Sequence, residues 1–243
     1  RLTASTIGDR SDMDSEAEHT EPGRPSRGVG IRPAEPPMED RSTRKRRIVL
    51  EAATTLFLRH GYLGTSMDEI AADAGVSKPT VYKFFADKEH LFSEIVLGTL
   101  DRAAGPLQAE IEGLAETADL DGELPRLARL YLATVMQPQV LQLRRLVIGA
   151  SHRLPALAKE YYERAPERTI GALAESFARL AERGLLVITD PAESAAQFAF
   201  LVLGRALDKS LFCGDKPFSD AELTAQADAG AAAFLAAYAG ASG

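Results

Sequence analysis

Cysteine is almost absent from this sequence, and long apolar runs are absent altogether. Cys213 is the only cysteine among 243 residues, so an intramolecular disulfide is excluded and a small secreted disulfide scaffold is not expected. No stretch approaches the roughly 20 apolar residues that a membrane-spanning helix needs, and the N-terminus lacks the apolar core of a signal peptide. We therefore expect a cytoplasmic chain that makes no contact with a membrane.

Groups that could carry catalysis or hold a metal ion are also scarce. The four histidines, His19, His60, His90 and His152, have no metal-ligand spacing to one another or to Cys213. No glycine-rich phosphate loop follows a strand, because no strand is predicted. Pairs of carboxylates abound, but a charged helical surface carries such pairs without any chemistry. We expect no catalytic residue, no metal site and no cofactor, and we expect that the chain is not an enzyme.

Net positive charge is confined to the middle of the chain. The whole sequence has a formal net charge of −7, whereas residues 41–98 carry nine basic and seven acidic side chains. Five of those basic side chains crowd into residues 41–47. Such asymmetry favours contact with nucleic acid or a membrane at the basic part. A solvated charge run at the start of a domain is the plainer alternative.

The hydrophobic pattern from Ser42 onward has the period of helices, and no alternating run predicts a sheet. Residues 1–41 hold five prolines, four glycines and no aromatic residue, so we predict a disordered tail. We expect an all-α chain with a three-helix domain over 42–90 and a larger helical domain over 91–243. Helices are predicted at 42–59, 66–75, 78–85, 87–104, 106–116, 123–136, 138–151, 155–164, 167–183, 191–212 and 220–239, with a break or kink at Gly105-Pro106.

The most informative stretch is residues 67–86, MDEIAADAGVSKPTVYKFFA. Its apolar positions have spacings that place them between two short crossed helices: Ile70, Ala74, Val76, Val81 and Phe84. Gly75 stands in the turn, where glycine most easily adopts a positive φ. This pattern predicts a helix-turn-helix, whose second helix enters the major groove of DNA. A plain helical hairpin is the alternative.

Residues 60–96 closely resemble the DNA-binding domain of the TetR family of transcriptional regulators. The resemblance is strong over 42–96, and a weaker one over 143–212 is to the AefR-like branch of that family. It implies a sequence-specific DNA-binding regulator, a repressor that a small molecule releases from a palindromic operator. The matching positions are Gly61-Tyr62, Thr65-Ser66, Ile70-Ala71, Ala74 to Ser77, Tyr82, Phe85 and Lys88-Glu89.

Eight residues are implied as DNA contacts by this resemblance. Contacts to phosphates are implied for Thr65, Ser66, Tyr82, Lys83 and Lys88. Their hydroxyl and ammonium groups suit that role, because both donate hydrogen bonds to phosphate oxygens. Base edges would be read by Lys78, Pro79 and Thr80, since lysine suits guanine acceptors and apolar atoms suit the thymine methyl group. Packing of the Tyr82 ring inside the small domain stays open as an alternative.

The predicted helix 191–212 points to a homodimer. Residues 198–203 read FAFLVL and are apolar all round, so this helix must be buried on both sides, in its own fold and against a partner. The resemblance implies that it forms a four-helix bundle with helix 167–183 and their copies. A central helix of a monomer is the alternative.

The second half could also enclose a small apolar or amphipathic ligand. Apolar residues with a few polar tips are the usual make-up of such a pocket. The candidate lining residues are Leu143, Val147, His152, Tyr161, Phe177 and Phe198. Each could instead be ordinary core, and His152 could be a surface histidine. The adjacent Arg144 and Arg145 could neutralise an acidic ligand, or could pair with Glu160 or Glu163.

Overall fold

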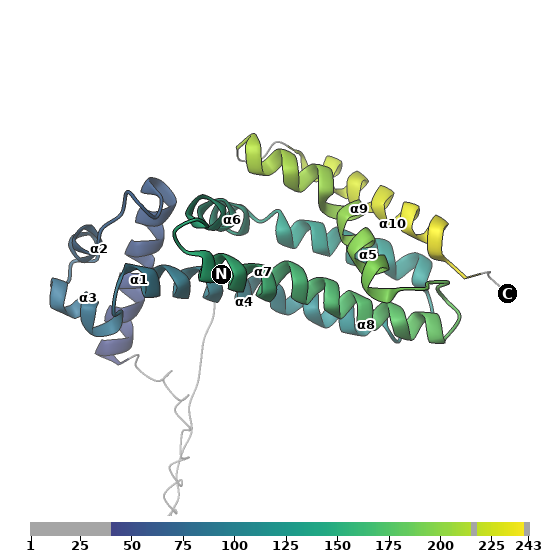
Figure 1. Cartoon of the computed structure of the whole chain (residues 1–243), viewed down its shortest axis with the longest axis horizontal. Coiled ribbons are helices and arrows are strands. Elements are labelled where there is room, and N and C mark those ends of the chain that lie inside the picture. The colour runs from purple at the N-terminus through teal and green to yellow at the C-terminus, as the bar shows by residue number, and fades with distance from the viewer. Residues whose placement is uncertain (1–39, 215–217, 241–243) are drawn as a thin grey trace, which may run out of the picture. The chain divides into compact units, whose positions relative to one another are not determined.

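The computed structural model describes residues 40–214 and 218–240, so the predicted tail lies outside the described residues except for its last two positions (Figure 1). The described residues form ten α-helices and one π-helical turn, and they include no strand beyond an isolated bridge between Leu186 and Ala239. The all-α prediction is confirmed. The helices are α1 Arg41–His60, α2 Met67–Asp73, α3 Lys78–Phe84, α4 Lys88–Leu114, α5 Leu120–Val135, α6 Pro138–Ala150, α7 Pro155–Tyr162, α8 Arg168–Glu182, α9 Pro191–Phe212 and α10 Asp220–Tyr238.

Helix α4 runs through Gly105-Pro106, where two separate helices were predicted. Proline removes one backbone N–H donor from the helix interior, which weakens the helix locally. On the far side of the proline, Leu107, Ile111 and Leu114 are buried in the same core cluster as side chains of α5 and α8. Tertiary packing therefore stabilises the helix beyond Pro106, where the local sequence pattern predicts its end.

The helices predicted at 155–164 and 167–183 correspond to α7 and α8, but the segment between them is helical as well. The chain continues from α7 into α8 through a π-helical turn, Glu163–Glu167, which contains Pro166.

Helix α5 begins earlier than predicted, because the Asp119 side chain accepts a hydrogen bond from the backbone N–H of Gly122 at 2.9 Å. Asp119 is thus the N-cap that the sequence analysis overlooked.

The hydrophobic core has two clusters, which both include side chains of α4. One cluster joins α1–α3 to the first half of α4 and to α6 and α7, with Phe57, Phe85 and Phe92 fully buried. The other joins the second half of α4 to α5, α8, α9 and α10. At its centre the rings of Phe177, Phe198 and Phe234 lie 4.9 to 5.6 Å apart. We call α1–α3 the small domain and α4–α10 the body. None of the described helices is long and apolar enough to cross a membrane.

Candidate functional sites

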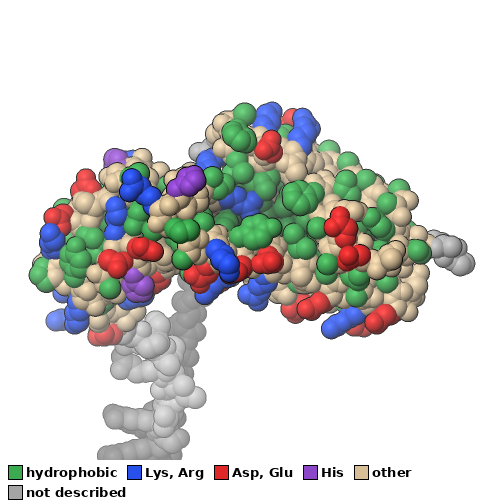
Figure 2. All heavy atoms as spheres, viewed as in Figure 1, with side chains coloured by type: hydrophobic (Ala, Val, Ile, Leu, Met, Phe, Trp, Pro, Cys, Tyr) green, Lys and Arg blue, Asp and Glu red, His purple; other side chains and the backbone are tan. Residues whose placement is uncertain are grey.

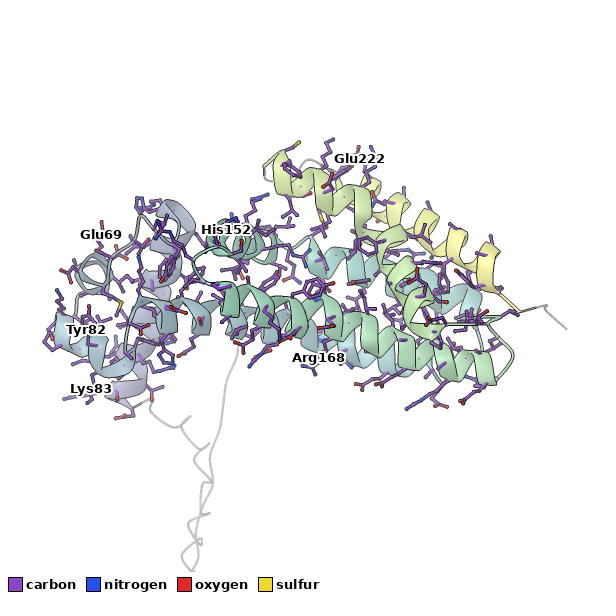
Figure 3. The ribbon with its side chains drawn as sticks, viewed as in Figure 1. Glu69, Tyr82, Lys83, His152, Arg168 and Glu222 are labelled. Carbon is purple, nitrogen blue, oxygen red and sulfur yellow. The ribbon has the colours of Figure 1, made fainter. Side chains whose placement is uncertain are left out.

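The small domain presents the outer face of α3. Val81 is fully buried beneath this helix, as is Ile70 on α2, and Gly75 has φ 62° in the turn between them. On the other side of α3 the Tyr82 ring is 45% exposed and Lys83 is exposed, and both project away from the domain (Figure 3). The alternative in which the Tyr82 ring packs inside the domain is therefore wrong. Pro79 is also exposed, so the face offers polar, basic and apolar atoms to an incoming surface.

Lys78, at the start of α3, forms an ion pair with α2. Its ammonium lies 2.7 Å from a carboxylate oxygen of Asp68, and both side chains are more than half exposed. The hydrogen bond from Lys78 to Asp68 raises the pKa of the lysine. Because the pair is open to solvent, it is weak and salt-sensitive. Lys78 can therefore exchange Asp68 for another acceptor at little cost.

The two hydroxyls before α2 have different roles. Ser66 caps α2: its hydroxyl accepts from the Glu69 N–H at 3.2 Å, and the Glu69 carboxylate accepts from the Ser66 N–H at 2.8 Å. Thr65 is only 2% exposed, and its hydroxyl donates to the Gly61 carbonyl at 2.9 Å. The Thr65 hydroxyl is buried and bonded within the loop, so it is not exposed to a phosphate as predicted. The Thr80 hydroxyl, which was predicted to face a base, lies 2.7 Å from the Ser77 hydroxyl.

Lys88 fixes the loop between α1 and α2 to the start of α4. Its ammonium donates to the carbonyls of Tyr62 and Thr65, both at 2.9 Å, and lies 4.4 Å from the centre of the Tyr62 ring. Lys88 was predicted only as a phosphate contact, and no local signal in the sequence indicates this structural role. An ammonium has three donors, and two of them are engaged here.

The basic cluster at the start of α1 is partly structural. The Arg46 guanidinium contacts Glu94 of α4 at 2.5 Å and lies 5.1 Å from the centre of the Phe85 ring. Arg47 pairs with Glu51 one turn along at 2.7 Å. Three further basic side chains, Arg41, Arg44 and Lys45, are exposed. Only part of the cluster is thus turned outward for a partner.

The body contains a cavity of about 530 Å³ between α4, α5, α6, α7, α8 and α9. Most of its lining is apolar, which suits a small organic molecule. Two of the predicted pocket residues, Val147 and Tyr161, line it. The other lining residues include Leu100, Ala104 and Leu107 from α4, Tyr131 and Val135 from α5, Arg144 and Ile148 from α6, Ala158 and Tyr162 from α7, Ile170 from α8, and Phe200, Leu203, Leu207 and Asp208 from α9.

Four of the predicted pocket residues lie elsewhere. Phe177 and Phe198 are fully buried in the aromatic cluster of the body, and Leu143 belongs to the other core cluster, with one side on a separate hollow between α1, α4 and α6. His152 is exposed in the turn after α6, so it is a surface histidine (Figure 3). Helical period places a residue on a face, but it cannot distinguish a face that meets a cavity from one that meets packed side chains.

The two adjacent arginines of α6 diverge. Arg145 donates to the carbonyls of Ser210 and Gly214, at 2.6 and 3.1 Å, and so ties α6 to the end of α9. Arg144 lines the cavity, where its Nε donates to the Tyr161 hydroxyl at 3.2 Å. Burial raises the pKa of Tyr131, a further cavity residue, to about 12. Tyr131 was not among the predicted cavity residues, because its position in the helical pattern is that of any core residue.

An apolar stripe runs along the exposed side of α9 and α8. Phe200 is 74% exposed, and hydrophobic side chains gather over α7, α8 and α9 in Figure 2. The members of the stripe are Ala196, Phe200, Gly204, Leu207 and Leu211 on α9, and Ile170, Ala174, Ala178 and Ala181 on α8, all at least partly exposed. Exposed apolar surface of this kind is typical of a protein contact or of a ligand-binding groove, and five residues of the stripe also line the cavity: Ile170, Phe200, Gly204, Leu207 and Leu211. Among the described residues, no group of three His, Cys, Asp or Glu side chains is placed to hold a metal ion.

Two family profiles match the chain. The profile of bacterial regulatory proteins of the tetR family matches residues 49–95, and that of the AefR-like transcriptional repressor C-terminal domain matches residues 122–240. Among curated relatives, the regulator YvkB of Bacillus subtilis is 28% identical over 74% of this chain and 88% of its own length. The regulator YhgD of the same organism is 49% identical, but the chain spans only 27% of its length.

Solved structures agree over most of the chain. A TetR-family transcriptional regulator from Mesorhizobium loti has a TM-score of 0.75 and 41% identity, and the match covers 83% of this chain and 100% of that one. The flavonoid-responsive regulator FrrA has a TM-score of 0.62 and 33% identity, with 82% of this chain and 99% of that one covered. Both similarities cover the small domain together with the body.

Proposed function

The chain belongs to the TetR family of transcriptional regulators, and on that premise we propose that it is a homodimeric repressor whose operator is palindromic and whose ligand occupies the cavity of the body. The observation that carries the proposal is the two-sided character of α3. Its inner side is buried on α2, while its outer side exposes Lys78, Pro79, Tyr82 and Lys83. A recognition helix needs this division, because it must be held rigidly and still reach base edges.

We propose that the side chains that position the protein on the DNA backbone differ from those that recognise the bases. Tyr82 and Lys83, with the Ser66 hydroxyl and the remaining donor of Lys88, would contact phosphates and set the register. Lys78, Pro79 and Thr80, at the N-terminal end of α3, would meet base edges, as the first residues of recognition helices do. Both Lys78 and Thr80 would then exchange their partners, Asp68 and Ser77, for DNA.

The proposed dimer forms through α8 and α9. Supporting this, the apolar stripe joins one large exposed ring, Phe200, to small residues such as Ala174 and Gly204 that allow close helix approach. Two copies related by a twofold axis would bury the same stripe on each other. Their α3 helices would then meet two half-sites about one DNA turn, roughly 34 Å, apart.

The proposed ligand site is the cavity, and three features support it. Its volume of about 530 Å³ lies within the range of small-molecule sites. Its lining includes α4, which also carries Lys88 at the edge of the small domain, so one helix links the two regions. The similar regulator FrrA is described as flavonoid-responsive, which indicates that a related fold responds to a small organic molecule.

Selection of bound DNA from a random pool tests the function. The full chain should enrich an inverted repeat, because two copies of α3 read the same half-site in opposite directions. Lys83→Ala should weaken binding to all sequences, whereas Lys209→Ala, a lysine of α9, should leave the selected site and its affinity unchanged. Recovery of unrelated sequences, with no affinity difference between the enriched site and its scrambled form, would overturn the proposal.

A further inference from the structure

The cavity of the body contains a positive charge, that of Arg144, which has no negative partner among the described residues. We propose that the cavity selects an amphipathic anion, a molecule with an apolar body and one acidic group that Arg144 binds. This inference rests on the proposed function in one respect, namely that the cavity is the ligand site. It adds the chemical class of the ligand, which neither the fold nor the apolar lining specifies.

Arg144 is half-buried on α6, and among the described residues it is the only basic one that lines the cavity. In the described part of the chain its only polar partner is the Tyr161 hydroxyl, and no carboxylate oxygen lies within 4.0 Å of it. A half-buried guanidinium without a counterion has lost hydration and gained little in return. An anion in the cavity would supply the missing partner.

The carboxylates that could have neutralised Arg144 are directed elsewhere. Glu160 contacts Arg164 at 2.7 Å, and Glu163 contacts Lys159. Both pairs lie on the outside of α7 and the π-helical turn, since Lys159, Glu163 and Arg164 are exposed. The neighbouring Arg145 is bound to two backbone carbonyls at the end of α9. The unmatched charge therefore belongs to Arg144 and to the cavity.

Two tyrosines beside Arg144 add neutral donors to the same place. Tyr161 accepts from Arg144, which leaves its own hydroxyl proton to donate. Tyr131 is 4% exposed, lines the cavity, and has no hydrogen bond from its hydroxyl to any described residue. Burial raises its pKa to about 12, so it remains a protonated donor. One cation and two hydroxyl donors suit a carboxylate, sulfonate or phenolate oxygen.

One carboxylate, Asp208 on α9, also contributes to the cavity lining. It is exposed, and no ion pair of the described chain joins it to Arg144. Screening by solvent makes an exposed carboxylate a weak opponent of an anion bound at a half-buried guanidinium. Asp208 also provides a control, because a cationic ligand would depend on Asp208 rather than on Arg144.

The test uses two fluorescent probes that differ by one anionic group: anilinonaphthalene sulfonate and phenylnaphthylamine, the same ring system without the sulfonate. Titration of the full 243-residue chain gives the affinity for each probe. The wild type should bind the sulfonate more tightly than its neutral parent. In Arg144→Met the sulfonate should lose about 10- to 100-fold, the range for a charged hydrogen bond, while the neutral probe changes little.

Control variants make the result specific to Arg144. Arg153→Met removes one positive charge from an exposed site outside the cavity and should change neither affinity. Asp208→Asn should leave sulfonate binding unchanged or slightly tighter. Arg144→Lys keeps the charge and should retain part of the preference. Light scattering and thermal unfolding of each variant verify that it folds as a dimer.

Two different failures are distinguishable. Ala158→Phe, which fills the cavity from α7, should abolish binding of both probes; binding that persists, or no binding to the wild type, would contradict the ligand site of the proposed function. Binding that Ala158→Phe blocks, but with equal affinity for both probes and no effect of Arg144→Met, would overturn the anion inference alone. Loss of sulfonate binding in Asp208→Asn but not in Arg144→Met would overturn it as well.

Discussion

The proposed DNA site and the cavity of the body differ in the partners of their positively charged side chains. Two of the three lysines that are proposed to meet DNA already have partners: Lys78 of α3 contacts Asp68, and Lys88 at the start of α4 donates to two carbonyls of the loop before α2. In the body, Arg144 faces an apolar cavity with one tyrosine hydroxyl as its partner. DNA must therefore compete with contacts that already exist, whereas a ligand would satisfy a charge that is unmet. The two sites should therefore respond differently when a charged side chain is removed.

The largest expected effect comes from separating the two copies. Phe200→Glu places a charge in the apolar stripe, so it should dissociate the dimer and weaken binding of the palindrome by about 100-fold or more, since each copy then binds alone. Light scattering and DNA titration measure both effects. Val187→Glu is the control, because Val187 is 69% exposed but lies outside α8 and α9. A dissociated Phe200→Glu that still bound the palindrome tightly would uncouple dimerisation from DNA binding.

Removing one charge from the proposed DNA site and one from the cavity should have different effects on the free energy of unfolding. Lys88→Met leaves two loop carbonyls without their donor and should cost about 1–3 kcal/mol of unfolding free energy. Arg144→Met removes a charge that lacks a counterion, so unfolding free energy should change by less than about 0.5 kcal/mol or should rise. Denaturant unfolding of both variants checks this. Equal losses would show that Arg144 is as firmly bonded as Lys88.

A smaller effect is expected from releasing Lys78. Asp68→Asn removes the exposed partner of Lys78 and one negative charge near α3, so affinity for random DNA should rise, by up to about fivefold at low salt, within the range of a surface ion pair. The gain should vanish at high salt because the interaction is screened. Asp208→Asn makes the same charge change in the body and should not alter DNA affinity. A gain in both variants would reflect net charge alone.

The smallest expected effect is a change in the pH dependence of stability. It can be compared between two capping boxes of the same kind, one at the start of α2 and one at the start of α10. Hydrogen bonds with Ser66 and Ser219 lower the pKa values of Glu69 and Glu222. A carboxyl whose pKa is lower in the folded state stabilises the fold above its unfolded pKa, about 4.3, and loses that contribution as pH falls through the folded value. Glu69→Gln and Glu222→Gln should therefore each flatten the fall in stability below about pH 4.3.

Hydrogen exchange locates these two effects. Glu69→Gln should raise amide exchange in α2, which has seven residues, more than Glu222→Gln does in α10, which has nineteen. A short helix depends more on its cap because few internal hydrogen bonds hold it. Equal exchange in both helices would indicate that packing, rather than capping, stabilises α2.

Local signals in the sequence predicted most of the helices but not their junctions. The capping boxes at Ser66 and Ser219 are local, and the structure confirms both. A break or a kink was predicted at Gly105-Pro106, and no break occurs there, because α4 continues through both residues into a packed core. The short gap predicted between 164 and 167 is filled by a π-helical turn that contains Pro166. A proline in the sequence indicates only that one backbone N–H donor is missing. Whether the helix continues past it depends on all the contacts that the helix makes.

The same limit applies to the sites. The helix-turn-helix was predictable because its residues are contiguous, but the buried Thr65 hydroxyl and the anchoring role of Lys88 depend on a loop 23 residues away from Lys88. The cavity combines six helices, so only Val147 and Tyr161 of the six predicted residues line it. The sequence offered Arg144 and Arg145 as equals, and only the positions of Ser210, Gly214 and Tyr161 distinguish them.

The most direct measurement of the central claim is the affinity of the full chain for its selected palindrome and for the same palindrome lengthened at its centre by half a helical turn, about 5 base pairs. A dimer that holds its two α3 helices in fixed register should lose about 100-fold or more in affinity, because the second half-site then faces away from the second helix. Equal affinity for the two DNAs would contradict a dimer that reads one operator with two linked recognition helices.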